Sequence, residues 1–153
     1  MPFVRQADPS NTGNITQTAS VDITLSPTTA VINATNMKPG DSVTGVINVS
    51  NIGTVDVYYF ISADWTAGGS TQPSMAALLA HKLSVSVEAG SPATSLYTGT
   101  LAGLVNQPAS PGRQLTLSTG NENVTITITL PSNAGSLYQN IEVSTDFVFV
   151  AQS

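Results

Sequence analysis

Apolar and polar residues alternate with a period of two along most of the chain. This alternation is typical of β-strands, because successive side chains of a strand point to opposite faces of its sheet. Clusters of proline, glycine and asparagine separate the alternating runs, as turns between short strands do. The pattern predicts strands at residues 21–25, 43–49, 56–65, 83–87 and 124–130, and a last strand at 147–150 that residues 141–143 lead into.

One segment departs from this alternation. Residues 74–81 contain strong helix formers, with Ser74 as a candidate N-cap, so we expect a short helix that covers one end of the sheets. Residues 11–18 are polar and weakly patterned, and the residues before about 17 could form an N-terminal arm. The sequence therefore predicts an all-β fold: a jelly-roll or Ig-like β-sandwich in residues 17–153, with one short helix and an extended N-terminal arm in residues 1–16.

The composition supports the β prediction and excludes some partners. Charged residues make up only 8% of the chain, whereas Thr and Ser occur 20 and 18 times, and β-branched Thr suits strands. The formal net charge is −5, and the four cations are far apart in the sequence. Nucleic acid binding requires several cations that neutralise phosphates, so we expect no such partner. No apolar run reaches the roughly 18 to 20 residues of a membrane-spanning helix.

The residue types that carry most catalytic and metal chemistry are rare. The chain has no cysteine and a single histidine, His81, which excludes thiolate zinc sites and the HExxH zinc motif. No G-x-S-x-G motif accompanies the many serines, so we interpret His81 as a residue partly packed at a helix end rather than a catalytic base. We therefore expect a protein that is not an enzyme and has no cofactor.

The acidic residues offer only weak candidate sites. Paired carboxylates for sugar cleavage also need an aromatic-lined cleft, and aromatic residues make up 6% of the chain. A calcium site at Asp41 or Asp64 stays open, although no EF-hand-like run supports it. The acids in or beside predicted strands are Asp22, Asp56, Asp64, Glu142 and Asp146.

Two further motifs have both a structural and a functional interpretation. The run Tyr58-Tyr59-Phe60, with Trp65, is more typical of a core strand than of a ligand platform. Four N-x-[ST] sequons are candidate glycosylation sites if the host modifies exported proteins at that motif; their asparagines are Asn14, Asn33, Asn48 and Asn123.

One stretch resembles the TasA/camelysin family of biofilm-matrix fibre subunits. Its first part, N-M-K-P-G-D at residues 36–41, predicts a turn, and a strand follows. Its second part, N-I-G at residues 51–53, predicts a tight turn into a returning strand. The A-S-V-D-I-T-L strand at residues 19–25 and the aromatic strand at 147–150 are similar to the family as well.

The resemblance implies export by a signal peptide that has been removed and assembly into extracellular fibres at the cell surface or in a biofilm matrix. Similar archaeal bundling pili imply a homopolymer in which the N-terminal strand of one subunit completes a sheet of the next, with neighbouring filaments as further partners in bundles. An arm of about ten extended residues spans roughly 33 Å, enough to cross a neighbouring sheet. Its candidate apolar contacts are Phe3, Val4, Ala7 and Ile15.

Two other functions stay in play. The first is a soluble extracellular sandwich module that binds carbohydrate or protein. The second is a secreted hydrolase that depends on His81. The protease activity associated with camelysin is not carried over, because the sequence has no cluster of metal ligands to support it.

Overall fold

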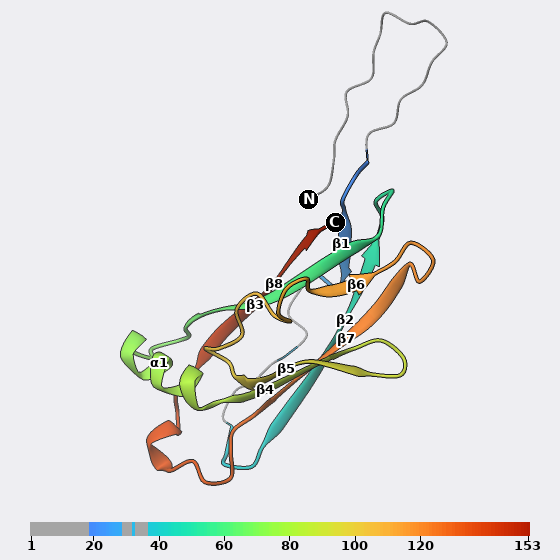
Figure 1. Ribbon diagram of the computed structural model, residues 1–153. Helices are drawn as coiled ribbons and strands as arrows, with labels where there is room; N and C mark the ends of the chain where they lie inside the picture. The colour runs from blue at the N-terminus through green and yellow to red at the C-terminus, as the bar shows by residue number, and fades with distance from the viewer. Residues whose placement is uncertain (1–18, 29–31, 33–36) are drawn as a thin grey trace, which may run out of the picture.

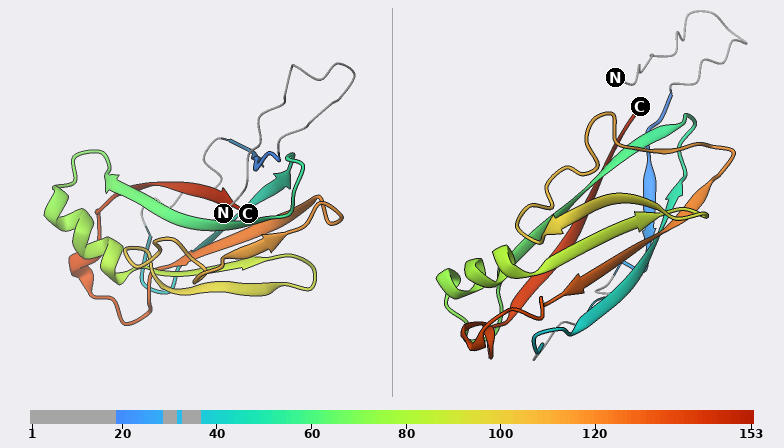
Figure 2. Two further views of the ribbon diagram at one scale, coloured as in Figure 1. Left: turned by 45° about the horizontal axis from the view of Figure 1, so that its top comes forward. Right: turned by 60° about the horizontal axis from the view of Figure 1, so that its bottom comes forward.

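Two antiparallel β-sheets pack face to face, as the all-β prediction expected (Figures 1 and 2). The computed structural model describes residues 19–28, 32 and 37–153. The predicted arm, with its donor residues Phe3, Val4, Ala7 and Ile15 and its sequon at Asn14, lies outside these residues, and so does Asn33.

The larger sheet has five strands in the order β1-β2-β7-β4-β5. The smaller sheet has three strands in the order β6-β3-β8. The strands of the larger sheet are β1 (Ile23–Ser26), β2 (Ser42–Asn51), β7 (Asn121–Thr129), β4 (Ser84–Ala89) and β5 (Thr94–Thr100). Those of the smaller sheet are β6 (Arg113–Leu115), β3 (Val57–Ala67) and β8 (Val143–Gln152).

The core lies between β7 of the larger sheet and β3 of the smaller one. The inward residues Val124 and Ile126 of β7 are fully buried, and so are Val57 and Tyr59 of β3. Each fully buried apolar side chain of this size contributes about 1.5–3 kcal/mol to stability. The alternation of residues 124–130 and the apolar run in residues 56–65 are therefore correct signs of the core, and both predicted strands are confirmed.

The helix α1 (Pro73–Lys82) confirms the predicted helix and covers one end of the sandwich (Figure 1). Its start differs from the prediction, because Gln72 rather than Ser74 is the N-cap residue and makes no side-chain capping bond. Pro73 occupies the first turn, where the N–H that proline lacks would have no helical partner. The buried face consists of Ala76, Leu79 and Ala80.

The sequence pattern did not indicate β5 and β6. A register shift beside Val87 interrupts the pairing of β5 with β4, and β5 contains Gly99, so its alternation is broken. Strand β6 follows Pro111-Gly112 and has only three residues, so it is too short to give a periodic signal. Both strands form because buried neighbours pair with them, which local sequence does not encode.

Candidate functional site

The sheets have four edges among the described residues, and only the edge at β8 is unprotected. Strand β1 has four residues, β6 has three, and β5 carries a bulge in its pairing with β4. Strand β8 has ten residues, pairs with β3 in an unbroken register, and contains no proline or lysine. Long straight edges expose backbone N–H and C=O groups to another strand. The free edge of β8 is therefore the candidate site.

The inward face of β8 is covered less well than that of its neighbour β3. Phe147 and Phe149 point inward but stay half-buried, whereas Tyr59 and Ile61 of β3 are 0% and 1% exposed. Phe149 does reach the core, with its ring centroid 5.9 Å from that of Tyr59. Apolar side chains thus line the free edge, and no strand of the described residues lies beyond them.

The edge strand β1 shows the same incomplete cover. Its inward residues Ile23 and Leu25 are half-buried, and they pack against the core. The C-terminal half of β8 lies close to β1 in both figures (Figures 1 and 2). Both sheets therefore leave apolar surface half-covered on this side of the sandwich, which we call the open side.

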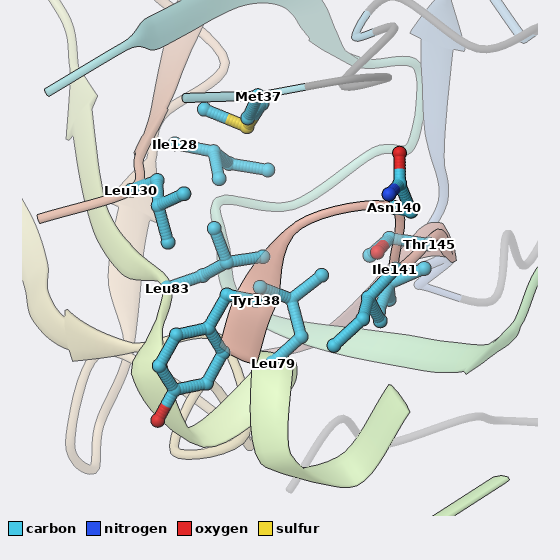
Figure 3. Close-up of a pocket in the computed structure, with 10 residues that line it drawn as sticks. Met37, Leu79, Leu83, Ile128, Leu130, Tyr138, Asn140, Ile141 and Thr145 are labelled. Carbon is cyan, nitrogen blue, oxygen red and sulfur yellow. The ribbon is translucent and has the colours of Figure 1, made fainter. Parts of the chain in front are cut away.

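A small apolar pocket of about 30 Å³ lies where β8 begins. Leu79 and Leu83, at the end of α1, face Ile128 and Leu130 across it, with Met37 close by (Figure 3). Val143 and Thr145 of β8 also line the pocket. Its volume is enough for a water-sized group, so it extends the apolar surface of the open side without forming a ligand cavity.

The turn at Asn51–Gly53 holds the chain just before β1. Thr54 donates its N–H to the carbonyl of Ser20 at 3.0 Å, and the Thr54 hydroxyl accepts the N–H of Ser20 at 2.9 Å. Gly53 packs against the backbone of Ser20 so closely that a Cβ would clash. The N-I-G turn thus holds Ser20, near the start of the described residues, against the domain.

A buried polar network joins the two sheets on the opposite side, which we call the closed side. The Tyr59 hydroxyl of β3 donates to Glu122 of β7 at 2.6 Å. Arg113 of β6 holds the same carboxylate with two bonds, from Nε at 3.0 Å and from Nη2 at 2.8 Å. Bidentate bonds of this kind are among the strongest polar contacts in proteins. The network ties β3 and β6 to β7.

The network also raises the pKa of two of its members, Tyr59 and Arg113. Burial raises the pKa of Tyr59, and the hydrogen bond to Glu122 and its negative charge raise it further. The hydrogen bond to Glu122 raises the pKa of Arg113 and outweighs the opposing effect of burial. Arg113 and Glu122 therefore form a charged pair beside a neutral phenol.

Sequence reasoning did not single out Glu122. The strand pattern nevertheless contains a signal, because counting back in twos from Val124 places Glu122 on the inward face of β7. A carboxylate at an inward position needs a cation or several donors. Arg113 is the cation that binds this carboxylate, and it lies nine residues earlier in the chain. No local motif in the sequence indicates that the two residues pair.

The other acids are dispersed, with one exception. Asp41 accepts the N–H of Lys38 at 2.9 Å and so closes a turn, and Asp56 accepts the N–H of Leu117 at 2.7 Å. Asp64 of β3 and Asp146 of β8 lie directly opposite each other in the register, and both are exposed. Across residues 19–28, 32 and 37–153, no three His, Cys, Asp or Glu side chains are grouped so that they could hold a metal.

His81 is exposed rather than partly packed, although it lies at the end of α1 as predicted. Its Nδ1 lies 2.8 Å from the carbonyl oxygen of Ala77, and its ring is T-shaped to that of Trp65 with the centroids 6.4 Å apart. Of the aromatic run, Tyr59 is fully buried, whereas Tyr58 and Phe60 are half-buried on the outer face of the sheet. The interpretation as a core strand holds for the inward residue.

Two of the sequon asparagines meet on the outer face of the larger sheet. Asn48 of β2 and Asn123 of β7 are register partners. The Asn48 side-chain amide donates to Asn121 at 3.1 Å and to Asn123 at 3.0 Å. Asn48 is half-buried and Asn123 is exposed, so the two side chains differ in access although their sequons are alike.

Comparison with known proteins identifies the family. The family model described as camelysin metallo-endopeptidase matches residues 3–108, which is more than half of the chain. The chain belongs to the camelysin family. Membership in this TasA/camelysin family suggests a biofilm-matrix protein, and the family is associated with the extracellular matrix. A search of curated proteins found no match. Within the described part of the chain, no helix is long and apolar enough to span a membrane.

Proposed function

We propose that this camelysin-family protein is a structural subunit of an extracellular filament, in which the N-terminal arm of one copy adds as a strand to β8 of the next. The observation that carries the proposal is the free edge of β8, ten residues long and free of proline and lysine. An added strand would satisfy the backbone groups of this edge and cover Phe147 and Phe149. Strand addition therefore suits both the polar and the apolar features of the edge.

The arm has the length and the attachment that this mechanism requires. Residues 1–16 precede Ser20, which the turn at Asn51–Gly53 holds in place, so the arm can leave its own domain without disturbing β1. Each ladder bond contributes about 0.5–1.5 kcal/mol, and full burial of an apolar side chain of the arm against the inward face of β8 adds about 1.5–3 kcal/mol. Ordering costs about 1–2 kcal/mol per residue, so only a well-matched strand yields a net gain.

The donor and acceptor surfaces differ, so the contact does not close on itself. Head-to-tail contacts of this kind build rings or open filaments rather than two-fold dimers, and we propose the open filament here. The family's association with the extracellular matrix supports assembly after export and signal-peptide removal. The partners are identical subunits, and neighbouring filaments are further partners where bundles form.

The proposal assigns a structural rather than a peptidase role, although the family description names a metallo-endopeptidase. A direct assay decides this point: purified protein is incubated with casein, with and without added Zn²⁺ and a chelator. We expect no cleavage above that of a heat-inactivated sample. Cleavage that Zn²⁺ stimulates and His81→Ala abolishes would favour a hydrolase instead.

The central experiment removes the arm. A variant without residues 1–15 and the variant Phe3→Asp are compared with the intact protein by sedimentation and negative-stain imaging. Val46→Asp is the matched control, because Val46 is an exposed valine on the outer face of the larger sheet, away from β8. We expect filaments from the intact protein and the control, and folded monomers from both arm variants. Normal filaments from both arm variants would contradict strand donation.

One observation favours the second candidate, a soluble binding module. An open hollow of about 710 Å³ lies beside Arg113 and Glu122, and amides and hydroxyls line it. Such groups can bind a carbohydrate, although the hollow has no aromatic side chain on which a sugar ring would stack. An intact protein that stays monomeric under all conditions and binds a glycan would favour this function over the filament.

A further inference from the structure

Two like charges face each other on the outer face of the smaller sheet. Asp64 and Asp146 are direct register partners in β3 and β8, and both are exposed. Neither carboxylate belongs to an ion pair among the described residues, where Arg113 and Glu122 form the only salt bridge. Like charges at directly opposite positions destabilise a sheet. A cation on the next strand outward from β8 would relieve this repulsion.

The neighbouring residues of β8 give its free edge a distinctive order. On the outer face, Val148 and Val150 follow Asp146 and are 44% and 54% exposed. On the inner face, the polar Thr145 precedes the aromatic Phe147, and both are half-buried. Read from residue 144 to residue 148, the edge is small, polar, acidic, aromatic and aliphatic.

The N-terminal arm carries the complementary order in reverse. Residues 3–7 read Phe-Val-Arg-Gln-Ala, and Arg5 is the only Lys or Arg side chain before Lys38. We propose that residues 3–7 of one copy pair antiparallel with residues 144–148 of the next, with Arg5 beside Asp146; this rests on the proposed strand donation. The pairs are Phe3 with Val148, Val4 with Phe147, Arg5 with Asp146, Gln6 with Thr145, and Ala7 with Ser144.

Other registers lose these matches. A shift by one residue turns Arg5 toward the core, because side chains alternate between the faces of a strand. A shift by two places Arg5 beside Val148 or Ser144 and leaves Asp146 without a cation. A parallel strand with Arg5 beside Asp146 brings Phe3 to Ser144 rather than to an apolar neighbour. In the antiparallel register Arg5 lies beside the oppositely charged Asp146. Apolar residues of the arm lie beside apolar residues of β8, and Gln6 lies beside the polar Thr145.

Proline supports the same register independently. Pro9 lacks the N–H that a ladder requires. In the antiparallel register Pro9 falls opposite Glu142, one residue before β8 begins at Val143. The proline therefore lies just outside the pairing, where it ends the added strand. The residues from Pro9 to Ser20 then connect the strand to its own domain.

Engineered disulfides test the register directly, because the natural chain has no cysteine. Ala7→Cys is combined in one chain with Ser144→Cys, and in matched controls with Asp146→Cys or Val148→Cys. Antiparallel partners have Cα atoms about 4.5–5.5 Å apart, within disulfide range. A displacement of two residues adds about 6.6–6.8 Å along the strand, which brings the Cα atoms out of that range.

On non-reducing gels we expect a ladder of covalent oligomers from the Ala7→Cys and Ser144→Cys chain, and at least tenfold less from the two controls. A ladder strongest with Val148→Cys would show a parallel strand and overturn the register. Cross-linked monomers without a ladder would show that the arm folds back on its own domain, which overturns pairing between copies.

A charge exchange tests the ion pair. Arg5→Asp and Asp146→Arg should each raise the protein concentration needed for filaments by roughly tenfold, because each places like charges beside one another. The double variant should return that concentration to within about threefold of the original. Single variants that assemble normally, or a double variant no better than either, would overturn the pairing of Arg5 with Asp146.

The arm deletion separates the two levels of this inference. If the chain without residues 1–15 still forms filaments, strand donation itself fails. If that deletion prevents filaments while the cross-links favour another partner, strand donation stands and the register is wrong.

Discussion

Strands β3 and β8 lie side by side in one sheet, and both place apolar residues inward, yet the burial of their inward faces differs. Tyr59 and Ile61 of β3 are fully buried, whereas Phe147 and Phe149 of β8 are half-buried. The difference comes from neighbours rather than residue types. Strand β3 has β8 on one edge and β6 on the other, where the carbonyl of Gln107 also accepts the N–H of Ile61. Among the described residues, strand β8 has a neighbour on one edge only.

The two sides of the sandwich differ in the same way. On the closed side, Arg113 and Tyr59 reach across to Glu122 and tie the sheets together. On the open side, the structure records no hydrogen bond or ion pair from β8 to the five-stranded sheet within the described part of the chain. Burial and polar contacts therefore hold one side shut and leave the other able to accept a strand.

The largest expected effect comes from breaking the closed side. Glu122→Ala leaves the Tyr59 hydroxyl without its acceptor and Arg113 without its counter-charge. Removing one partner of a buried, hydrogen-bonded pair is strongly destabilising, so we expect the free energy of unfolding to fall by about 3 kcal/mol. Urea denaturation measures the change. Glu88→Ala, at an exposed position on β4, is the control and should change stability by no more than about 0.5 kcal/mol.

A variant that keeps the shape of the side chain guards against loss of the fold. Glu122→Gln should still accept a bond from Tyr59 and fold, while it loses the ion pair with Arg113. If both Glu122 variants are as stable as the original protein, the polar network does not hold the closed side.

The same substitution, valine to alanine, measures how much burial contributes to stability on the two sides. Val57→Ala removes two carbons from a fully buried site on β3 and should cost about 2 kcal/mol. Val143→Ala removes the same atoms from a half-buried site on β8 and should cost less than about 1 kcal/mol in the monomer. Urea denaturation of both variants gives the two values. Equal losses would mean that the open side is already covered in the monomer.

The pKa of Tyr59 predicts a smaller, pH-dependent effect on the closed side. A tyrosine in the unfolded chain releases its proton near pH 10, whereas burial and Glu122 raise the pKa of Tyr59 in the folded state. Above pH 10 the unfolded chain therefore binds fewer protons, and the free energy of unfolding falls as the pH rises. We expect a loss of about 1 kcal/mol by pH 11.

Tyr59→Phe isolates this contribution, because Tyr58, Tyr97 and Tyr138 remain in both proteins. The variant should be less stable at neutral pH, since Glu122 loses a donor, but its stability should fall less steeply between pH 9 and pH 11. Urea denaturation across this range measures both slopes. Parallel slopes would show that Tyr59 releases its proton as readily in the folded state as in the unfolded chain.

The sequence predicted the strands whose two faces differ and missed the features that depend on distant partners. Alternation located β7, because inward residues such as Val124 are apolar and their neighbours are polar. A continuous apolar run located β3, and a cluster of helix formers located the short helix. The sequence pattern did not show that β8 is an edge strand and β3 a central one. A pattern of apolar residues indicates which face of a strand is buried, but not whether another strand pairs with its edge. The pairing of Glu122 with Arg113 was likewise hidden, because it depends on how β6 and β7 meet.

The smallest expected effect on stability concerns the free edge itself. Val148→Lys replaces a valine that is 44% exposed on the outer face of β8, and surface changes of this kind alter stability by less than about 0.5 kcal/mol. Natural proteins use lysine at sheet edges to prevent strand addition, and in the proposed register the lysine would lie beside Phe3. We therefore expect a folded protein, by circular dichroism and urea denaturation, whose filament yield in sedimentation drops at least tenfold.

Val46→Lys makes the same substitution at a valine that is also 44% exposed, on β2 of the larger sheet. Because β2 lies between β1 and β7 and has no free edge, this control should assemble normally. The contrast between the two lysines therefore separates an effect of the β8 edge from a general effect of surface charge. If both variants assemble equally well, the β8 edge is not where copies join. If both fail, charge on the filament surface rather than the edge limits assembly.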